Sequence, residues 1–124
     1  MHAMSGSCNM DLSKLHKWLE PNGRVHVAFS GGADSLCLAH FLSKQPLAST
    51  SDRIICWHLD HGLDPESGHR ALAAKERALE LGLPIKSVKL NMKTGGNLEA
   101  RAREKRYAFF REVVGSGDVL VTAH

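Results

Sequence analysis

The stretch VHVAFSGGADSLCLA, residues 25–39, joins two apolar segments through a short polar turn. Residues 24–29 form a β-branched and aromatic run of strand length that ends at glycine. From Ser35 to about residue 44 the chain is apolar on nearly every side, which is typical of a helix packed between a sheet and another layer, with Asp34 or Ser35 as its N-cap. The stretch therefore predicts a strand, a turn and a helix. In an open α/β sheet such a turn lies at the carboxyl end of the strand, where ligands bind.

The turn itself, Ser30-Gly31-Gly32-Ala33-Asp34-Ser35, has the chemistry of a phosphate cradle. Glycine allows a ligand to approach the backbone closely, the first amides of the helix attract an anion, and two serine hydroxyls add donors. Asp34 would repel phosphate unless a divalent cation such as Mg²⁺ lies between them. The Walker-type loop and the dinucleotide fingerprint fit poorly, because no Lys follows the glycines and Ser35 takes the place of a third glycine. A plain Gly-Gly turn with an aspartate cap remains the alternative.

Helical and strand patterns alternate along the rest of the chain. Strands are expected at 24–29, 53–59, 84–90 and 118–123, and helices at 11–19, 35–44, 67–81 and 97–114. This alternation predicts an α/β fold with a Rossmann-like parallel sheet of four strands, order 3-2-1-4, and helices on both faces. Residues 1–10 are small, polar and patternless, and are expected to form a disordered or vector-derived leader. The chain stops directly after the fourth strand, which suggests a truncated domain with an uncovered, association-prone edge.

Composition is that of a soluble globular domain. The chain has 124 residues, 43% apolar and 23% charged, and no apolar run long enough for a membrane span. Three unevenly spaced cysteines argue against a disulfide framework and a four-cysteine metal site, so a cytoplasmic protein is expected. The net charge is only +3, but five basic residues crowd one segment and suit a polyanionic partner: Arg101, Arg103, Lys105, Arg106 and Arg111.

The helix expected from residue 97 carries charges on its apolar side. Its buried arc is predicted to contain Leu98, Ala102, Phe109, Phe110 and Val113. Glu99, Arg103 and Arg106 fall within the same arc, whereas Arg101 and Lys105 fall outside it. The inward charges either pair with one another, line a pocket for an anion, or extend over the apolar arc to solvent.

The second strand ends in a polar cluster, His58, Asp60 and His61, at the same edge as the glycine turn. These residue types can bind metal, but nothing else in the sequence completes a tetrahedral site. A pocket for adenine or ribose is the favoured interpretation.

The turn 30–35 resembles the SGGxDS loop of the N-type ATP pyrophosphatases, the PP-loop superfamily. Further segments resemble the tRNA(Ile)-lysidine synthetase family, collinearly from about residue 24 to the end: DHGL (60–63), NLEA (97–100), Ala102-Arg103, Arg106-Tyr107 and TAH (122–124). Asp64 departs from the Arg that is common after DHGL. The resemblance makes 11–124 the N-terminal part of a PP-loop ATP-binding catalytic domain. It implies a ligase that uses ATP and Mg²⁺ to adenylate the wobble cytidine of tRNA(Ile), after which L-lysine displaces AMP and gives lysidine.

The same resemblance implies roles for individual residues. ATP would be bound by Ser30, Gly31, Gly32, Ala33, Asp34, Ser35, Asp60, His61 and Gly62. The lysine and tRNA side would comprise Asn97, Glu99, Arg103, Arg106 and Tyr107. Asp34, Arg103 and Arg106 would be catalytic, and Asp34 would form part of the Mg²⁺ site. The chain alone is expected to be inactive, and homodimerisation is left open. Two alternatives are another PP-loop tRNA-modifying enzyme, such as a thiolation enzyme, although the segment has no CxxC pair, and a non-catalytic ATP-binding module.

Overall fold

The computed structural model describes residues 2–6, 12–30, 32–46, 53–62, 65–90, 92 and 95–123. The strands are β1 (His2–Gly6), β2 (Val25–Ala28), β3 (Ile54–Asp60), β4 (Ile85–Lys89) and β5 (Val119–Ala123). The helices are α1 (Leu12–Trp18), α2 (Ala33–Ser43), α3 (Ser67–Glu80) and α4 (Leu98–Val113). The predicted elements are therefore present with boundaries shifted by a few residues, as fraying ends allow. Within these ranges no helix is long and apolar enough to cross a bilayer.

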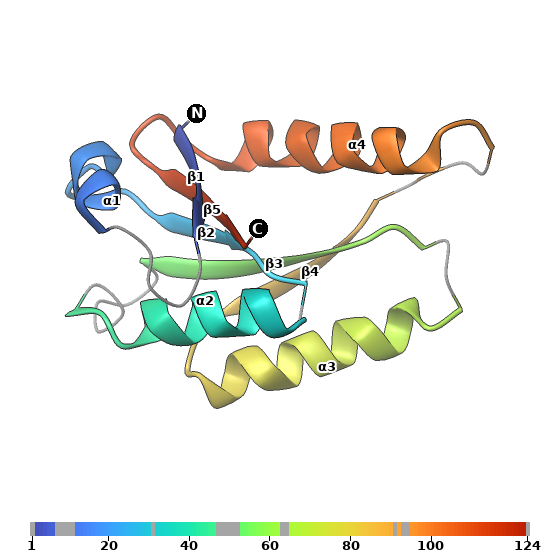
Figure 1. Cartoon of the computed structure of the whole chain (residues 1–124), viewed down its shortest axis with the longest axis horizontal. Helices are drawn as coiled ribbons and strands as arrows, with labels where there is room; N and C mark the ends of the chain where they lie inside the picture. Colours follow the sequence, from blue (N-terminus) through green and yellow to red (C-terminus); the bar gives the residue numbers. More distant parts are fainter. Residues whose placement is uncertain are drawn as a thin grey trace.

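All strand pairs in the sheet are parallel, and the strand order is β1-β5-β2-β3-β4 (Figure 1). The four strands expected from the sequence keep the predicted order, since 3-2-1-4 corresponds to β4-β3-β2-β5. The strand order therefore reverses at β2: β3 and β4 are added on one side of it and β5 on the other. In open α/β sheets such a switch point is where ligands bind.

Residues 2–6 correct two of the sequence-based expectations. They form a fifth strand rather than a disordered leader, and they pair with the whole of β5. Met4 packs against the main core and His2 stacks on the Trp18 ring at a centroid distance of 4.8 Å. The sequence gives little sign of this strand, because its five residues lack a period-2 apolar pattern and depend on β5 for their backbone partners. β5 is consequently not an edge strand, and the expected association along its edge loses its basis.

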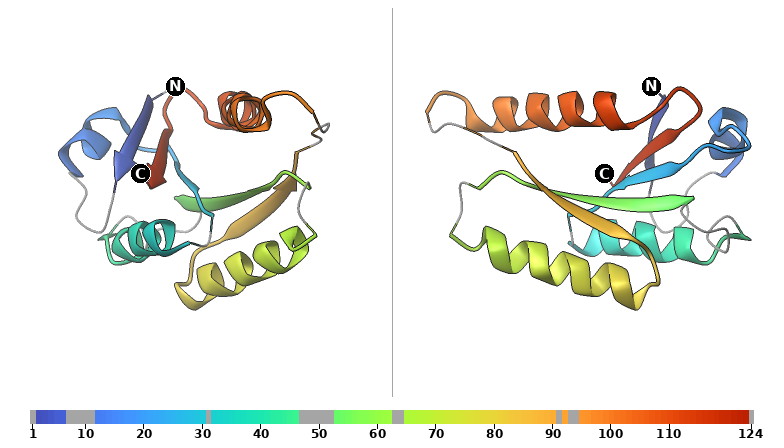
Figure 2. Two further views of the ribbon diagram at one scale, coloured as in Figure 1. Left: turned by 45° about the vertical axis from the view of Figure 1, so that its right-hand side comes forward. Right: turned by 180° about the vertical axis from the view of Figure 1, so that it is seen from behind.

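The sheet separates two apolar clusters of different size. The larger lies under α1, α2 and α3 and is built on alternate residues of three strands, such as Val27, Cys56 and Val121. The smaller lies under α4 and contains Phe110, Val114 and Leu120. Figure 2 shows α4 alone on its side of the sheet, opposite α2 and α3. Helices thus cover both faces, as a buried parallel sheet requires.

The cysteines differ from expectation in one respect. Cys37 on α2 is disulfide-bonded, which the uneven spacing of the cysteines did not indicate. Cys56 is free and buried in the larger cluster, and burial raises the pKa of its thiol to about 12. Cys56 is therefore a neutral packing residue rather than a nucleophile.

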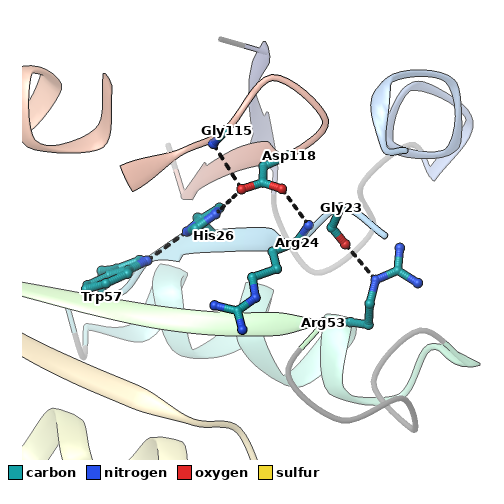
Figure 3. Close-up of polar contacts among 7 residues, drawn as sticks. All are labelled: Gly23, Arg24, His26, Arg53, Trp57, Gly115 and Asp118. Carbon is teal, nitrogen blue, oxygen red and sulfur yellow. Dashed lines mark hydrogen bonds and ion pairs between the residues drawn. The ribbon is translucent and has the colours of Figure 1, made fainter. Parts of the chain in front are cut away.

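A buried polar network links three strands on the α4 side of the sheet (Figure 3). The Trp57 indole N–H donates to His26 Nδ1 at 2.9 Å, and because that indole can only donate, His26 must use its Nε2–H toward Asp118 Oδ2 at 2.8 Å. Asp118 also accepts from the backbone N–H groups of Arg24 and Gly115, at 2.8 and 3.0 Å. One carboxylate thus fastens the turn before β5 to β2, and through His26 to β3.

The contribution of this network to stability is expected to depend on pH. Burial alone would raise the pKa of Asp118, but hydrogen bonds from Arg24, His26 and Gly115 outweigh it and hold the pKa below its ordinary value. A lowered carboxyl pKa stabilises the fold at neutral pH, and this contribution is lost as the pH falls below about 4. We expect Asp118→Asn to lower the free energy of unfolding by about 1–3 kcal/mol at pH 7 and to flatten its decline between about pH 5 and 3. Urea titrations at several pH values test this; parallel pH curves for the two proteins would contradict it.

Candidate functional site

The glycine turn lies at the carboxyl end of β2, where the sequence placed it, and leads directly into α2. Ser30 Oγ lies 3.0 Å from Ser35 Oγ and accepts from the Gly32 N–H at 3.2 Å. Ser35 Oγ donates to the Gly32 carbonyl at 3.2 Å, so Ser30 is the donor in the pair of hydroxyls. The two serines therefore close the turn onto itself and fix its shape. Gly31 lies outside the described residues.

The helix cap differs from the prediction. The N-cap is Gly32, with no side-chain cap, rather than Asp34 or Ser35. Asp34 and Ala33 are exposed on the first turn of α2, whereas Ser35 is buried. The Asp34 carboxylate makes no hydrogen bond or ion pair with the described residues, so it is not committed to holding the helix together. The first amides of a helix have no carbonyl one turn earlier to bond, and here they lie beside this carboxylate.

The end of β3 supplies a second wall at the same edge. Asp60 is buried and its Oδ1 accepts from the Gly62 N–H at 2.8 Å, forming a tight turn in which Gly62 has a φ of +71°. Only glycine adopts such a φ without strain. His58, also buried, donates through Nδ1 to the Phe29 carbonyl at 3.2 Å. This bond holds the last residue before Ser30 against β3, so β3 positions the glycine turn.

His61 follows β3 at this edge, and the charge of Arg106 from α4 acts on it. Among the described residues His61 Nδ1 is buried without a hydrogen-bond partner. Burial lowers the pKa of His61, the Arg106 charge and His58 lower it further, and Asp60 opposes them. The charge of Arg106, on α4, therefore acts on His61 at the end of β3. The role predicted for Arg106 at the nucleotide edge stays a prediction.

The predicted buried arc of α4 needs correction. Phe110 is buried, and Ala102, Phe109 and Val113 are half-buried, but Leu98 is 36% exposed. Glu99, Arg103 and Arg106 share the helix face of Phe110 and are nevertheless exposed. Figure 1 shows the reason: the amino-terminal half of α4 extends past the sheet on the side toward which the strand arrows point. Above the sheet this face of α4 would be buried in the core. Here it extends beyond the carboxyl edge of the sheet.

The charged residues of this overhang do not pair with one another. No ion pair joins Glu99, Arg103 or Arg106 to another residue that the structure describes. Arg103 lies over the Tyr107 ring at 5.6 Å, a cation–π contact that leaves its guanidinium N–H groups open. Asn97 is the N-cap of α4, with its side chain accepting from the Ala100 N–H at 3.2 Å. Of the three alternatives for the inward charges, mutual pairing is thus excluded for the described part of the chain.

A hollow of about 310 Å³ lies elsewhere, lined by His16, Leu19, Glu20, Pro21 and Arg53. Pro21 and Arg53 precede β2 and β3, so this hollow belongs to the opposite, amino edge of the sheet. None of the residues predicted to bind ATP lines it, and we assign no nucleotide site there. The described residues contain no group of three His, Cys, Asp or Glu side chains arranged to hold a metal ion.

Two features of the site were missed at the level of sequence. The bond from His58 to the Phe29 carbonyl joins residues 29 positions apart. The charge of Arg106 acts on His61 across 45 positions. In the sequence His58 is distinguished only by its place in the polar end of the strand. The helical arc predicted the direction of Arg106, but it did not predict that the charge of Arg106 acts on His61.

Comparison with known proteins decides the family. A model described as the PP-loop domain matches residues 4–124. The chain belongs to the PP-loop domain family. Curated relatives are named tRNA(Ile)-lysidine synthase: that of Pseudomonas aeruginosa is 33% identical over 112 residues, covering 90% of this chain and 25% of the relative. That of Shewanella woodyi is 38% identical over 103 residues, covering 82% and 22%. This chain thus spans about a quarter of the length of these relatives.

A solved PP-loop structure supports the fold. The U34-tRNA thiolase NcsA from Methanococcus maripaludis, with its [4Fe-4S] cluster, superposes with a TM-score of 0.62 at 22% identity. The match covers 90% of this chain and 43% of the thiolase. The α/β fold predicted from the sequence is therefore confirmed. At this level of identity the likeness concerns the fold alone. Membership of the PP-loop family implies use of ATP.

Proposed function

We propose that this chain is the ATP-binding catalytic unit of a tRNA(Ile)-lysidine synthetase. In this function ATP adenylates the 2-carbonyl oxygen of the wobble cytidine, and the lysine ε-amine then displaces AMP to form lysidine. The observation that carries the proposal is the convergence of three matched segments on one sheet edge: the turn 30–35, the end of β3 and the overhanging half of α4. The consistent name of the relatives supports the substrate, tRNA(Ile).

Each of these three segments has a chemistry suited to one part of the reaction. The closed turn between Ser30 and Ser35 and the start of α2 offer backbone and hydroxyl donors to the ATP phosphates. The Asp60–Gly62 turn and His61 face the nucleoside side. Arg103 and Arg106 are cations without ion-pair partners in the described part of the chain, and so are available to an anion or to RNA phosphate. Glu99 and Tyr107 accompany them on the lysine and tRNA side.

The residues present fit a magnesium ion held jointly by protein and nucleotide. Asp34 supplies an exposed, uncommitted carboxylate beside the anion-attracting end of α2. A single carboxylate with phosphate oxygens is a common way to hold Mg²⁺, which keeps several waters. When bound there, Mg²⁺ would neutralise phosphate charge during attack on the α-phosphorus.

Two other functions are distinguished by specific observations. A thiolation enzyme is favoured only by the structural neighbour, whose identity of 22% concerns the fold. Its sulfur chemistry has no counterpart in Cys56, which is buried and neutral. A non-catalytic ATP-binding module would need the turn 30–35 but gives no reason for the unpaired Arg103 and Arg106 over the crevice.

Pyrophosphate release tests the proposed function. A full-length synthase carrying this domain should release pyrophosphate only when unmodified tRNA(Ile) and Mg-ATP are both present, and should incorporate radiolabelled lysine into that tRNA. The 124-residue chain alone should bind Mg-ATP weakly and show no lysine incorporation, because it spans only about a quarter of the length of the relatives that carry that name. Incorporation of sulfur rather than lysine would replace the proposal with the thiolation alternative.

Charge removal on α4 should affect ligation according to helix face. Arg103→Ala and Arg106→Ala are expected to lower kcat/KM for lysine incorporation by roughly a hundredfold, since each removes an unshielded cation from the crevice. Arg111→Ala, at an exposed position on the opposite face of α4, should change it by less than about threefold. Arg101 is a poorer control because it donates to the Gly95 carbonyl. Equal losses in all three variants would show that the charges act only as a general attraction for RNA.

A further inference from the structure

The outer face of α3 carries large apolar side chains that the fold itself does not use. α3 packs on the sheet through small residues, since Ala74 and Ala78 are fully buried in the larger apolar cluster. Its two leucines point away from that cluster, with Leu72 56% and Leu79 61% exposed. Leucine is among the residues most often buried, so this helix has the reverse of the usual arrangement. Figure 2 shows α3 along the outer side of the molecule in both views.

The two leucines lie on one stripe of the helix. At about 100° per residue, positions seven apart differ by only about 20° around the axis and lie two turns, about 10 Å, apart. Lys75 and Glu76 lie between them, which gives the spacing i, i+3, i+4, i+7 with which one helix packs against another. All four side chains are exposed. In the described part of the chain no hydrogen bond or ion pair engages Lys75 or Glu76.

This stripe is complementary to itself. Its midpoint falls between Lys75 and Glu76. A second α3 that lies antiparallel to the first, related to it by a two-fold axis at this midpoint, places Leu72 opposite Leu79 of the partner subunit. The same axis places Lys75 opposite Glu76 of the partner subunit, and the reverse pair forms by symmetry. Both apolar contacts and both pairs of opposite charges therefore form together, whereas two like charges at these positions would repel the second copy.

We propose that the outer face of α3 is an interface through which two copies of this chain associate. The leucines supply the apolar contact, and the pairs of Lys75 with Glu76 determine the antiparallel direction and the register more than they add affinity. One pair of helices makes a small interface, so the dimer is weak, with a dissociation constant of roughly 10 µM to 1 mM. The inference is independent of the proposed function, because the stripe contains no residue of the predicted ATP or tRNA site.

Sedimentation equilibrium of the 124-residue chain measures this association. The weight-average mass should rise from that of one chain toward that of two as the concentration increases from about 1 µM to 1 mM. Leu72→Ala should weaken dimerisation about tenfold or more, because it removes an apolar contact on each side of the axis. Leu98→Ala shortens an exposed leucine on α4 instead, so this matched control should dimerise as wild type does. Circular dichroism should show the same helix content in all variants.

Charge reversal distinguishes a second copy from any other partner. Lys75→Glu sets carboxylates against carboxylates across the axis, and Glu76→Lys sets ammonium groups against ammonium groups, so each should weaken dimerisation about tenfold or more. The double variant Lys75→Glu/Glu76→Lys restores both pairs with the charges exchanged and should dimerise within about threefold of wild type. An equimolar mixture of the two single variants should form a heterodimer, because each then meets the opposite charge.

Distinct outcomes overturn the inference. A wild-type mass that stays at one chain up to 1 mM shows that this face does not bind a second copy. A dimer that Leu72→Ala and both charge reversals leave unchanged places the interface elsewhere on the chain. Single variants whose loss is recovered neither in the double variant nor in the mixture contradict the antiparallel register. Lysine incorporation, which tests the proposed function, is a separate measurement, so each of these failures leaves that proposal standing.

Discussion

Asp34→Asn is expected to lower the affinity of the chain for Mg-ATP on the order of a hundredfold while leaving its fold intact. Asp34 is the exposed carboxylate of the glycine turn, and it makes no hydrogen bond or ion pair with the described residues. Its removal therefore costs the folded state no contact beyond the favourable position of an acid near the start of α2, worth less than about 1 kcal/mol. Bound phosphate, in contrast, would lose the group that holds the neutralising cation beside it.

Calorimetric titration with ATP, in the presence and absence of Mg²⁺, separates these roles. In the wild type Mg²⁺ should strengthen ATP binding strongly, and in Asp34→Asn the two titrations should become similar. Glu76→Gln, which removes an exposed acid of α3 away from the crevice, is the matched control and should behave as wild type does. An Asp34→Asn variant with undiminished, Mg²⁺-dependent affinity would leave Asp34 as a residue of the helix start only.

The parts of the fold that the sequence predicted are those governed by local pattern and chain topology. Short, β-branched apolar runs such as VLVTA (119–123) are typical of buried strands, and alternation with helices of ten or more residues favours parallel pairing. The order of the four predicted strands follows from placing helices on both faces of the sheet. The position of the turn 30–35 at the carboxyl edge follows from the same rule, independently of any resemblance.

Features that depend on distant partners could not be predicted. β1 owes its conformation to the edge of β5, more than a hundred residues away, and its own residues show no strand periodicity. The bond between His26 and Asp118 joins residues 92 positions apart. Helical periodicity correctly gave the face of α4 but not the distance to which α4 overhangs the sheet, so Leu98 was predicted to be buried and is exposed. Periodicity determines direction around an axis, whereas burial also depends on what lies opposite.

The overhang explains why α4 can carry charged residues on this face without a large loss of stability. A buried, unpaired Arg103 or Arg106 would cost several kcal/mol. Beyond the edge of the sheet the same side chains remain exposed to solvent. The apolar half of α4, with Phe110 against Leu120, fixes the helix on the sheet and so fixes the position of the cations.

The largest effect on stability is expected from Gly23→Ala, at the amino edge of the sheet. A Cβ added to Gly23 would lie 2.0 Å from the Gly117 carbonyl oxygen, a backbone atom that cannot rotate away. That oxygen also accepts from the Glu20 N–H at 3.0 Å, and Gly117 immediately precedes Asp118. Making room for one methyl group must therefore move the turn that carries Asp118, which strains its bonds to Arg24 and His26. We expect a loss of about 3 kcal/mol or more in the free energy of unfolding, at or above the upper end for overpacking.

Urea denaturation followed by circular dichroism measures this loss, and a second glycine provides the control. Gly68 lies on α3 with no atom within 4 Å of an added Cβ, so Gly68→Ala should raise stability by roughly 0.5–1 kcal/mol through helix propensity alone. If steric conflict between the turns at 23 and 117 is the cause, combining Gly23→Ala with Asp118→Asn should cost less than the sum of the two, because both weaken the same turn. Strict additivity, or a Gly23→Ala variant within about 1 kcal/mol of wild type, would show that this turn can shift freely without disturbing Asp118.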